Sequence, residues 1–140
     1  MSAGKLYFLL SFMLVLFLSP NDIYAQEIPD SLRQKLLSAT NDSVKARALL
    51  DIGEAIEATA TEKSFDYYQQ ALAVSKKIKN SKLILSSLND IGVCYIELNK
   101  MDSAIAIFGQ AILVAKELND TLRVARITAN IGNVYLHKKD

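Results

Sequence analysis

Cysteine and histidine are almost missing from this chain of 140 residues, which contains one of each, Cys94 and His137. A single cysteine excludes an internal disulfide, and one cysteine with one histidine cannot form the usual four-ligand zinc set. Cys94 lies between Val93 and Tyr95 in an apolar segment, which is typical of a small core residue. We therefore expect His137 on the surface, and no metal, no cofactor and no Cys–His nucleophile.

Proline and glycine are also scarce. The two prolines are Pro20 and Pro29, and none occurs in the 111 residues that follow, so no proline interrupts a helix there. The five glycines are isolated along the chain rather than grouped. Their isolation excludes a glycine-rich loop of the kind that binds phosphate.

The chain lacks an excess of charge of one sign. It has 16 lysines and arginines against 15 aspartates and glutamates, a formal net charge of +1. Nucleic-acid-binding regions usually carry a basic patch that neutralises phosphates, so we expect no nucleic-acid partner. Glu54 and Glu57 share one face of a predicted helix, but solvated charge explains them better than acid–base chemistry. We predict that the protein is not an enzyme.

What the chain does have is a strong helical periodicity between residues 84 and 118. Apolar residues recur at spacings of three and four, which places them on one helix face, and the pattern restarts after residues 99 and 100. Two helices joined by so short a turn must be antiparallel. The two stripes are Ile84, Leu88, Ile91, Tyr95 and Leu98, then Ala104, Phe108, Ala111, Ala115 and Leu118.

Gly92 lies near the middle of the first of these helices. A glycine there costs about 1 kcal/mol relative to alanine, so its presence needs a structural reason. We expect that the backbone at Gly92 closely approaches the second helix where Ala104 and Phe108 cross it.

The helical pair is part of an internal repeat. Residues 71–95 shifted by 40 positions align without a gap on residues 111–135, so that Ile91-Gly92 matches Ile131-Gly132. Upstream, Ile52-Gly53 lies 39 positions before Ile91-Gly92. A fixed period of this length in an all-helical chain predicts an all-α fold, an α-solenoid of stacked antiparallel helical hairpins.

These residues resemble the tetratricopeptide repeat. The middle repeat matches the family's pattern fully, the first has Ile56 in place of the tyrosine, and the third ends after its own glycine and tyrosine. The period of 39 to 40 residues exceeds the family's usual period of about 34, and this longer form is similar to exported bacterial repeats. The residues that define the packing pattern are Gly53, Tyr68, Ala71, Leu88, Gly92, Tyr95, Ala104, Phe108, Ala111, Gly132 and Tyr135.

Residues 1–25 have the pattern of a secretory signal peptide. Lys5 precedes an apolar run over residues 6–18, which is too short to span a bilayer as a helix, and Ala25 offers a cleavage site. The alternative is an uncleaved anchor; in both cases the rest of the chain is expected outside the cytoplasm, in the periplasm or extracellular space. Apart from this segment, or a missing C-terminal part that tethers the chain, we expect no membrane contact.

The remaining chain divides into a linker with an N-terminal capping helix at 26–41 and repeats at 42–80, 81–119 and 120–140, the last incomplete. The capping helix would use Leu32, Leu36 and Leu37 as its apolar stripe; a flexible linker is the alternative. The final helix is expected to hold apolar residues for a partner helix that the sequence does not supply. The chain is then a fragment, or its last helix caps itself or forms a homodimer. The apolar residues of the final helix that we expect to face a partner helix are Ile127, Ile131, Val134 and Tyr135.

The resemblance implies that the first helix of each hairpin lines a concave face that binds a protein or peptide. Asparagines there can hydrogen-bond a peptide backbone without reading its sequence; otherwise they are simply solvated or hold neighbouring helices. The Lys–Asn pair four residues apart that binds a C-terminal carboxylate in some members is not found. By the family's offsets from the glycine, further positions are Asp51, Asp90, Ile96 and Leu136. The binding residues that we predict are Glu54, Glu57, Asn89, Val93, Asn130 and Asn133.

The sequence thus predicts an exported module that binds proteins or peptides without catalysis. The alternative is the N-terminal sensory ectodomain of a membrane signal transducer with a histidine kinase or DNA-binding output. With their period of 39 to 40 residues, the repeats of this chain are similar to exported repeats that precede histidine kinase or DNA-binding modules. The sensory-ectodomain alternative depends on that similarity alone.

Overall fold

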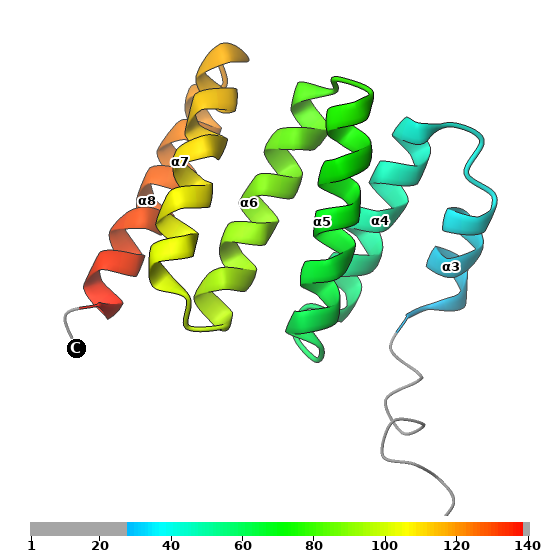
Figure 1. Cartoon of the computed structure of the whole chain (residues 1–140), viewed down its shortest axis with the longest axis horizontal. Helices are drawn as coiled ribbons and strands as arrows, with labels where there is room; N and C mark the ends of the chain where they lie inside the picture. Colours follow the sequence, from blue (N-terminus) through cyan, green and yellow to red (C-terminus); the bar gives the residue numbers. More distant parts are fainter. Residues whose placement is uncertain (1–27, 139–140) are drawn as a thin grey trace, which may run out of the picture.

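The computed structural model describes residues 28–138, in which there are six α-helices and no strand (Figure 1). The predicted signal peptide lies outside these residues. None of the helices within them has the length and hydrophobicity needed to cross a membrane. The helices are α3 (Asp30–Leu37), α4 (Asp42–Ile56), α5 (Thr61–Lys77), α6 (Ser81–Glu97), α7 (Met101–Glu117) and α8 (Thr121–His137).

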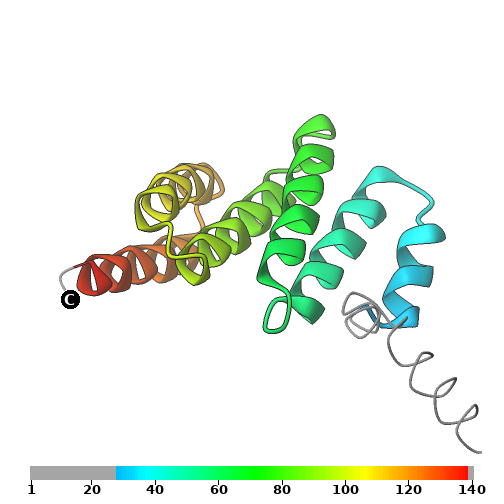
Figure 2. The same cartoon turned by 60° about the horizontal axis from the view of Figure 1, so that its bottom comes forward.

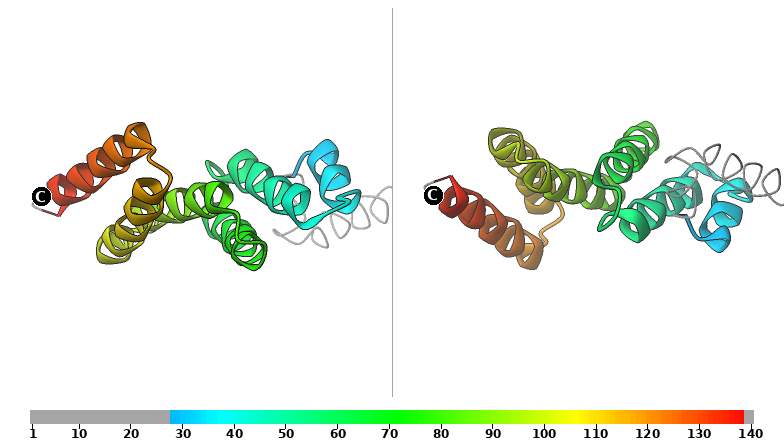
Figure 3. Two further views of the ribbon diagram at one scale, coloured as in Figure 1. Left: turned by 90° about the horizontal axis from the view of Figure 1, so that it is seen from above. Right: turned by 90° about the horizontal axis from the view of Figure 1, so that it is seen from below.

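The helices form an all-α solenoid in which each packs against the next in the chain. Helices α4 and α5 form one antiparallel hairpin and α6 and α7 the next, while α8 follows at the end of the row (Figure 1). Figures 2 and 3 show α4, α6 and α8 on one side of the row and α5 and α7 on the other. Helices α4 and α6 contact each other only slightly.

The first helix of each hairpin begins with a polar N-cap residue. The side chains of Asn41, Asn80 and Asp120 accept hydrogen bonds from backbone N–H groups three residues later, at 3.0, 3.2 and 3.0 Å. Such caps satisfy N–H groups that have no partner within the helix. The caps lie 39 and 40 positions apart, so the sequence period is also the structural period.

Three turns end their helices in the same way. Lys79, Asn99 and Asn119 have φ of 54°, 56° and 54°, in the left-handed region. In each turn the next residue donates its N–H to the carbonyl five residues before it, at 3.0, 2.7 and 2.9 Å. This pairing is the Schellman motif, which satisfies carbonyls at the helix end. The connections are therefore short and fixed, and they hold successive helices antiparallel.

The two internal glycines allow the hairpins to close. A Cβ atom at Gly92 would lie 2.7 Å from Cδ1 of Phe108, and one at Gly53 would lie 2.7 Å from Cδ1 of Tyr68. Both rings are buried, at 0% and 1% exposure. Each hairpin thus packs an aromatic ring directly on the backbone of its first helix, as the sequence predicted at Gly92. Most of the pattern residues are buried with them: Ala71, Leu88, Ala104 and Ala111.

The structure of α8 differs in part from the prediction for the last repeat. Ile127 and Val134 were expected to await a partner helix, but they are 2% and 0% exposed, in the cluster that includes Ala111 and Ala115 of α7. The expectation was wrong for these two residues because α7 already covers them. Tyr135, in contrast, is 52% exposed.

Helix α3 packs against α4 at the start of the row. Lys35 forms an ion pair with Asp51 of α4 at 2.5 Å, and Leu36 packs against the first core cluster. Leu37 was predicted to belong to the apolar stripe, but its side chain is 74% exposed. The helix ends at this residue, so the stripe has no further turn in which to continue.

Candidate binding groove

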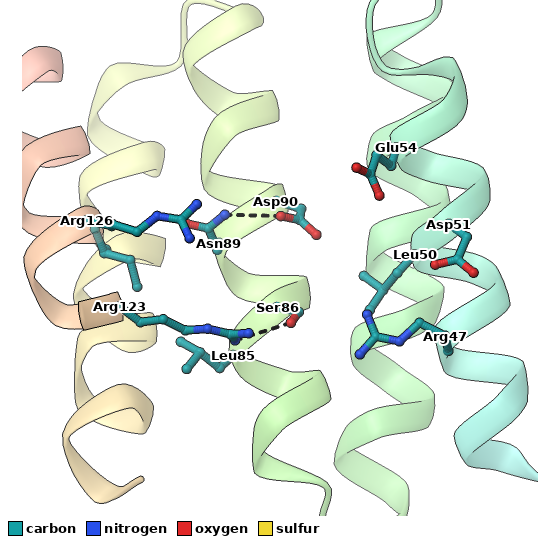
Figure 4. Close-up of a pocket in the computed structure, with 11 residues that line it drawn as sticks. Arg47, Leu50, Asp51, Glu54, Leu85, Ser86, Asn89, Asp90, Arg123 and Arg126 are labelled. Atoms are coloured by element: carbon teal, nitrogen blue, oxygen red, sulfur yellow. Dashed lines mark hydrogen bonds between the residues drawn. The ribbon is translucent and has the colours of Figure 1, made fainter. Parts of the chain in front are cut away.

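A groove with a volume of about 190 Å³ crosses α4, α6 and α8 (Figure 4). These are the first helices of successive hairpins, on the side that the repeat pattern predicts for binding. The groove lies where α4 and α6 contact each other only slightly, on the side of the row opposite α5 and α7 (Figure 3). Its lining residues are Arg47, Leu50, Asp51, Glu54, Leu85, Ser86, Asn89, Asp90, Arg123, Arg126 and Ile127.

Two of the predicted binding residues, Glu54 and Asn89, line this groove, together with Asp51 and Asp90 from the family's offsets. Four predicted residues do not line it, because they lie further along the same helices toward their C-terminal ends. Val93 and Asn130 are half-buried and Asn133 is exposed. The fourth is Glu57, which has an internal hydrogen bond.

Glu57 accepts a hydrogen bond at 3.0 Å from the hydroxyl of Tyr68, the core tyrosine that packs on Gly53. Burial raises the pKa of Glu57, and the negative charges of Glu97 and Glu54 raise it further, while the Tyr68 hydroxyl opposes this rise. Burial, and the charge of Glu57, raise the pKa of Tyr68 above its ordinary value. Glu57 therefore contributes to the packing of the first hairpin, and a contact with a ligand there remains a prediction.

The sequence analysis did not identify the arginines of the groove. Arg47 projects from α4 into the space that faces α6, and Arg123 and Arg126 extend from α8 toward α6 (Figure 4). Arg123 is fixed: its Nη1 donates to Ser86 Oγ at 3.3 Å, and its Nε lies 3.4 Å from Asp120. The family's offsets run from two residues before the glycine to four after it, whereas these arginines lie six to nine residues before the glycine of their helix.

Negative charge gathers on the facing sides of α4 and α6. Glu54 lies on α4 across from Asp90 on α6 (Figure 4), and Asp90 is the more enclosed of the two. Burial raises the pKa of Asp90 to about 6, and repulsion from Glu57 and Glu54 adds to the rise. A hydrogen bond from the Asn89 amide, at 3.1 Å, and the charge of Arg123 oppose it. A cation delivered by a ligand would stabilise this carboxylate.

The groove therefore has two polar zones. Its acidic zone comprises Glu54 and Asp90, and its basic zone comprises Arg123 and Arg126 on α8. Within residues 28–138, neither Glu54 nor Arg126 has an ion-pair partner, and Arg47 also has none. These groups keep their full capacity to bind charges of the opposite sign.

Metal-binding clusters and a reactive thiol are two features that the described segment lacks. No set of three or more His, Cys, Asp or Glu side chains there could hold a metal ion. Cys94 is fully buried beside the Ser64 hydroxyl at 3.4 Å, and burial raises the pKa of its thiol to about 11. A protonated, buried thiol is a poor nucleophile, so Cys94 acts as a core residue.

Comparison with known protein families finds a match. The family model described as "Tetratricopeptide repeat" matches residues 45–117, from α4 to the end of α7. The matched segment holds both glycine–aromatic contacts and all of the groove-lining residues on α4 and α6. No curated protein matches the chain.

Proposed function

This chain belongs to the tetratricopeptide repeat family, and from that premise we propose that it binds an extended segment of a partner protein in the groove across α4, α6 and α8. Repeats of this family form protein-interaction modules, so the broad class of function follows from membership. The proposal adds the location of the site and the chemistry of the segment that it binds.

The carrying observation is the separation of opposite charges in the groove. Glu54 and Asp90 offer negative charge between α4 and α6, while Arg126 offers positive charge from α8. An extended peptide with a basic residue toward the acidic zone and an acidic residue toward the basic zone would pair both. The amide of Asn89 lies between the two zones, where it can hydrogen-bond a peptide backbone (Figure 4).

Binding in this groove would proceed without chemical turnover. The groups that face the ligand are carboxylates, guanidinium groups and one amide, arranged for recognition by charge and shape. The residues that we assign to the interaction are Arg47, Glu54, Asn89, Asp90 and Arg126, while Val93, Asn130 and Asn133 would contact a longer segment that continues along the helices.

We further propose that the protein acts outside the cytoplasm. This proposal is supported by Lys5, the apolar run at 6–18 and the cleavage site at Ala25. Intact mass spectrometry of the protein from its own cell envelope tests it, because export with cleavage predicts an N-terminus at Gln26. An N-terminus at Met1 would contradict cleavage. A polypeptide much longer than 140 residues would favour the sensory-ectodomain alternative.

Peptide binding can be tested with defined probes. Fluorescent dodecapeptides that carry one lysine and one glutamate at varied spacing would be titrated with the full chain and followed by fluorescence anisotropy. We expect Arg126→Ala and Glu54→Ala each to weaken the tightest peptide by about tenfold, the loss typical of one charged contact in a groove.

Matched substitutions outside the groove provide controls. Arg33→Ala on α3 and Glu117→Ala on α7 remove the same charges from exposed positions, and we expect each to leave the affinity unchanged. Equal losses in the groove and control variants would show non-specific charge attraction. Binding by no probe of the set, or binding indifferent to Arg126 and Glu54, would contradict the proposal.

A further inference from the structure

A second groove lies between α5 and α7, on the opposite side of the row from the peptide groove, and has a volume of about 330 Å³. Figure 1 shows α6 between these two helices. We call this site the outer groove. It shares no lining residue with the peptide groove. The residues that line it are Gln69, Leu72, Ala73, Lys76, Ile91, Tyr95 and Ile107.

The floor of the outer groove is apolar and belongs to the core. Ile91 of α6 is 2% exposed. Leu72, Tyr95 and Ile107 are half-buried, and all three pack against both core clusters. Because the core holds these side chains from one side, they offer a fixed apolar surface to a ligand on the other.

A small residue on α5 leaves room in the outer groove. Ala73 is exposed and lines the groove, whereas the equivalent residue of the next repeat, 40 positions later, is Leu113. The Leu113 side chain is 62% exposed, so a leucine at this position extends outward from its helix. With alanine in its place, the space beside α5 is free for an apolar side chain of a ligand.

Charges of opposite sign lie toward the two ends of the outer groove. Its edge on α5 is a stripe of exposed residues at spacings of three and four, namely Asp66, Gln69, Ala73 and Lys76. Lys76 lines the groove, and Asp66 lies one turn beyond Gln69 at the other end. The two charged residues are ten positions apart, which is about 15 Å along a helix. Within residues 28–138, neither has an ion-pair partner.

We propose that the outer groove binds one amphipathic helix of a partner protein, with acidic residues at one end of that helix and basic residues at the other. The acidic end would pair with Lys76 and the basic end with Asp66. Two apolar residues one turn apart would fill the space beside Ala73. Charge complementarity at both ends of an apolar groove carries this proposal, and it does not depend on the peptide groove.

The shape of the site favours a helix as the occupant. Helices α5 and α7 run in the same direction, because each is antiparallel to α6. The side-chain ridge of a third helix can pack into a groove between two such helices. A helix with acidic residues in its first turn and basic residues in its last turn is also stabilised by its own dipole. The charges that the groove requires are therefore compatible with a stable helix.

A second copy of this chain fits the outer groove less well. Its α5 has the charges for an antiparallel pair, in which Asp66 of each copy would meet Lys76 of the other. Between these charges, however, that helix would present Gln69 and Ala73 to the groove, and neither is a large apolar side chain. The apolar floor would remain unfilled, so we assign the groove to a different protein.

The probe is a fluorescent alanine-based peptide of about 16 residues, long enough to be partly helical. It has two leucines one turn apart at its centre, glutamates at its N-terminal end and lysines at its C-terminal end. It would be titrated with the full chain and followed by fluorescence anisotropy, and we expect saturable binding. The same peptide with both leucines replaced by alanine should bind at least about tenfold more weakly, since the leucines make the apolar contact.

Two variants of the protein locate the bound peptide. Ala73→Leu introduces the side chain that the next repeat has at this position, so the protein should remain folded while the groove is filled. We expect it to weaken binding by about tenfold. Lys76→Glu makes both ends of the groove negative. It should weaken binding by about tenfold and should favour a version of the peptide with lysines at both ends.

Each variant has a matched control on α7. Ala106→Leu adds the same side chain at an exposed position that does not line the groove. Lys116→Glu reverses the charge of the residue equivalent to Lys76, which is also exposed and outside the groove. Both controls should bind the peptide as tightly as the unmodified protein.

Three results would overturn the proposal. One is the absence of saturable binding. Another is binding that Ala73→Leu and Lys76→Glu leave unchanged, or that the controls weaken equally, since the peptide would then occupy another part of the surface. The third is a dimer in sedimentation velocity that Ala73→Leu dissociates, which would assign the outer groove to a second copy of the chain.

Discussion

Substituting alanine at Gly92 and at Gly132 should change the stability in opposite directions, although the two positions are equivalent in the repeat. Both glycines lie inside helices, where alanine is favoured by about 1 kcal/mol. At Gly132 the new methyl group meets nothing within 4 Å, so this gain should appear as added stability. At Gly92 the methyl group would lie 2.7 Å from Cδ1 of Phe108.

The Phe108 ring cannot move aside easily, because it is 0% exposed and lies inside the second core cluster. Forcing an extra carbon into a packed core costs about 1–3 kcal/mol. The helix preference for alanine offsets about 1 kcal/mol of this steric cost. Gly92→Ala should therefore lower the free energy of unfolding by up to about 2 kcal/mol. Because the helix preference is common to both variants, their difference isolates the steric cost of about 1–3 kcal/mol.

Urea unfolding followed by far-UV circular dichroism measures these differences. Gly109→Ala supplies a second open helical position and should match Gly132→Ala. Equal m-values across the set would show that the variants unfold over the same surface. If Gly92→Ala were as stable as Gly132→Ala, the ring of Phe108 would not be held on the glycine, and the packing described for the hairpins would be refuted.

Three further substitutions test other features of the structure. The Ser75 hydroxyl is buried without a hydrogen-bond partner within residues 28–138, and the equivalent residue of the next repeat is Ala115. Ser75→Ala should therefore raise the free energy of unfolding by about 1 kcal/mol. A lower free energy of unfolding in urea would contradict this. Lys79→Gly should raise the free energy of unfolding by about 0.5–1 kcal/mol in the same assay, because glycine adopts the φ of 54° found at Lys79 without strain. A lower free energy of unfolding would mean that the lysine itself stabilises the turn. Because the folded state raises the pKa of Asp90 from about 3.9 to about 6, its ionisation should lower stability as the pH rises from about 4 to 6. Asp90→Asn should therefore be more stable than the unmodified protein at pH 7, by at most about 3 kcal/mol. Thermal melts of the two proteins that coincide at pH 7 would show that the inference is wrong.

The sequence predicted the fold well because the signal is local and repeated. The spacing of Gly92, Ala104 and Phe108 determines which helix faces meet, and the caps at Asn41, Asn80 and Asp120 mark where each hairpin begins. Each of these features depends on residues within one repeat. Periodicity and capping are therefore enough to derive them.

The groove was predicted only in part, because it depends on how successive repeats are placed beside one another. Glu54 was found from its offset to the glycine and Asn89 from the hydrogen-bonding capacity of its amide. Arg47 and Arg126, in contrast, come from different repeats and line one groove only through the superhelix. The burial of Ile127 was missed for a related reason, since the pattern shows which residues are apolar but not which neighbouring helix covers them.

The central claim is that the face formed by α4, α6 and α8 binds a peptide, and NMR titration of the isotopically labelled full chain tests it most directly. With the tightest dodecapeptide as ligand, the account predicts that backbone amide shifts concentrate at Arg47, Glu54, Asn89, Asp90 and Arg126, and that Arg126→Ala reduces them. Shifts confined to α5 and α7, on the opposite side of the row, would contradict it.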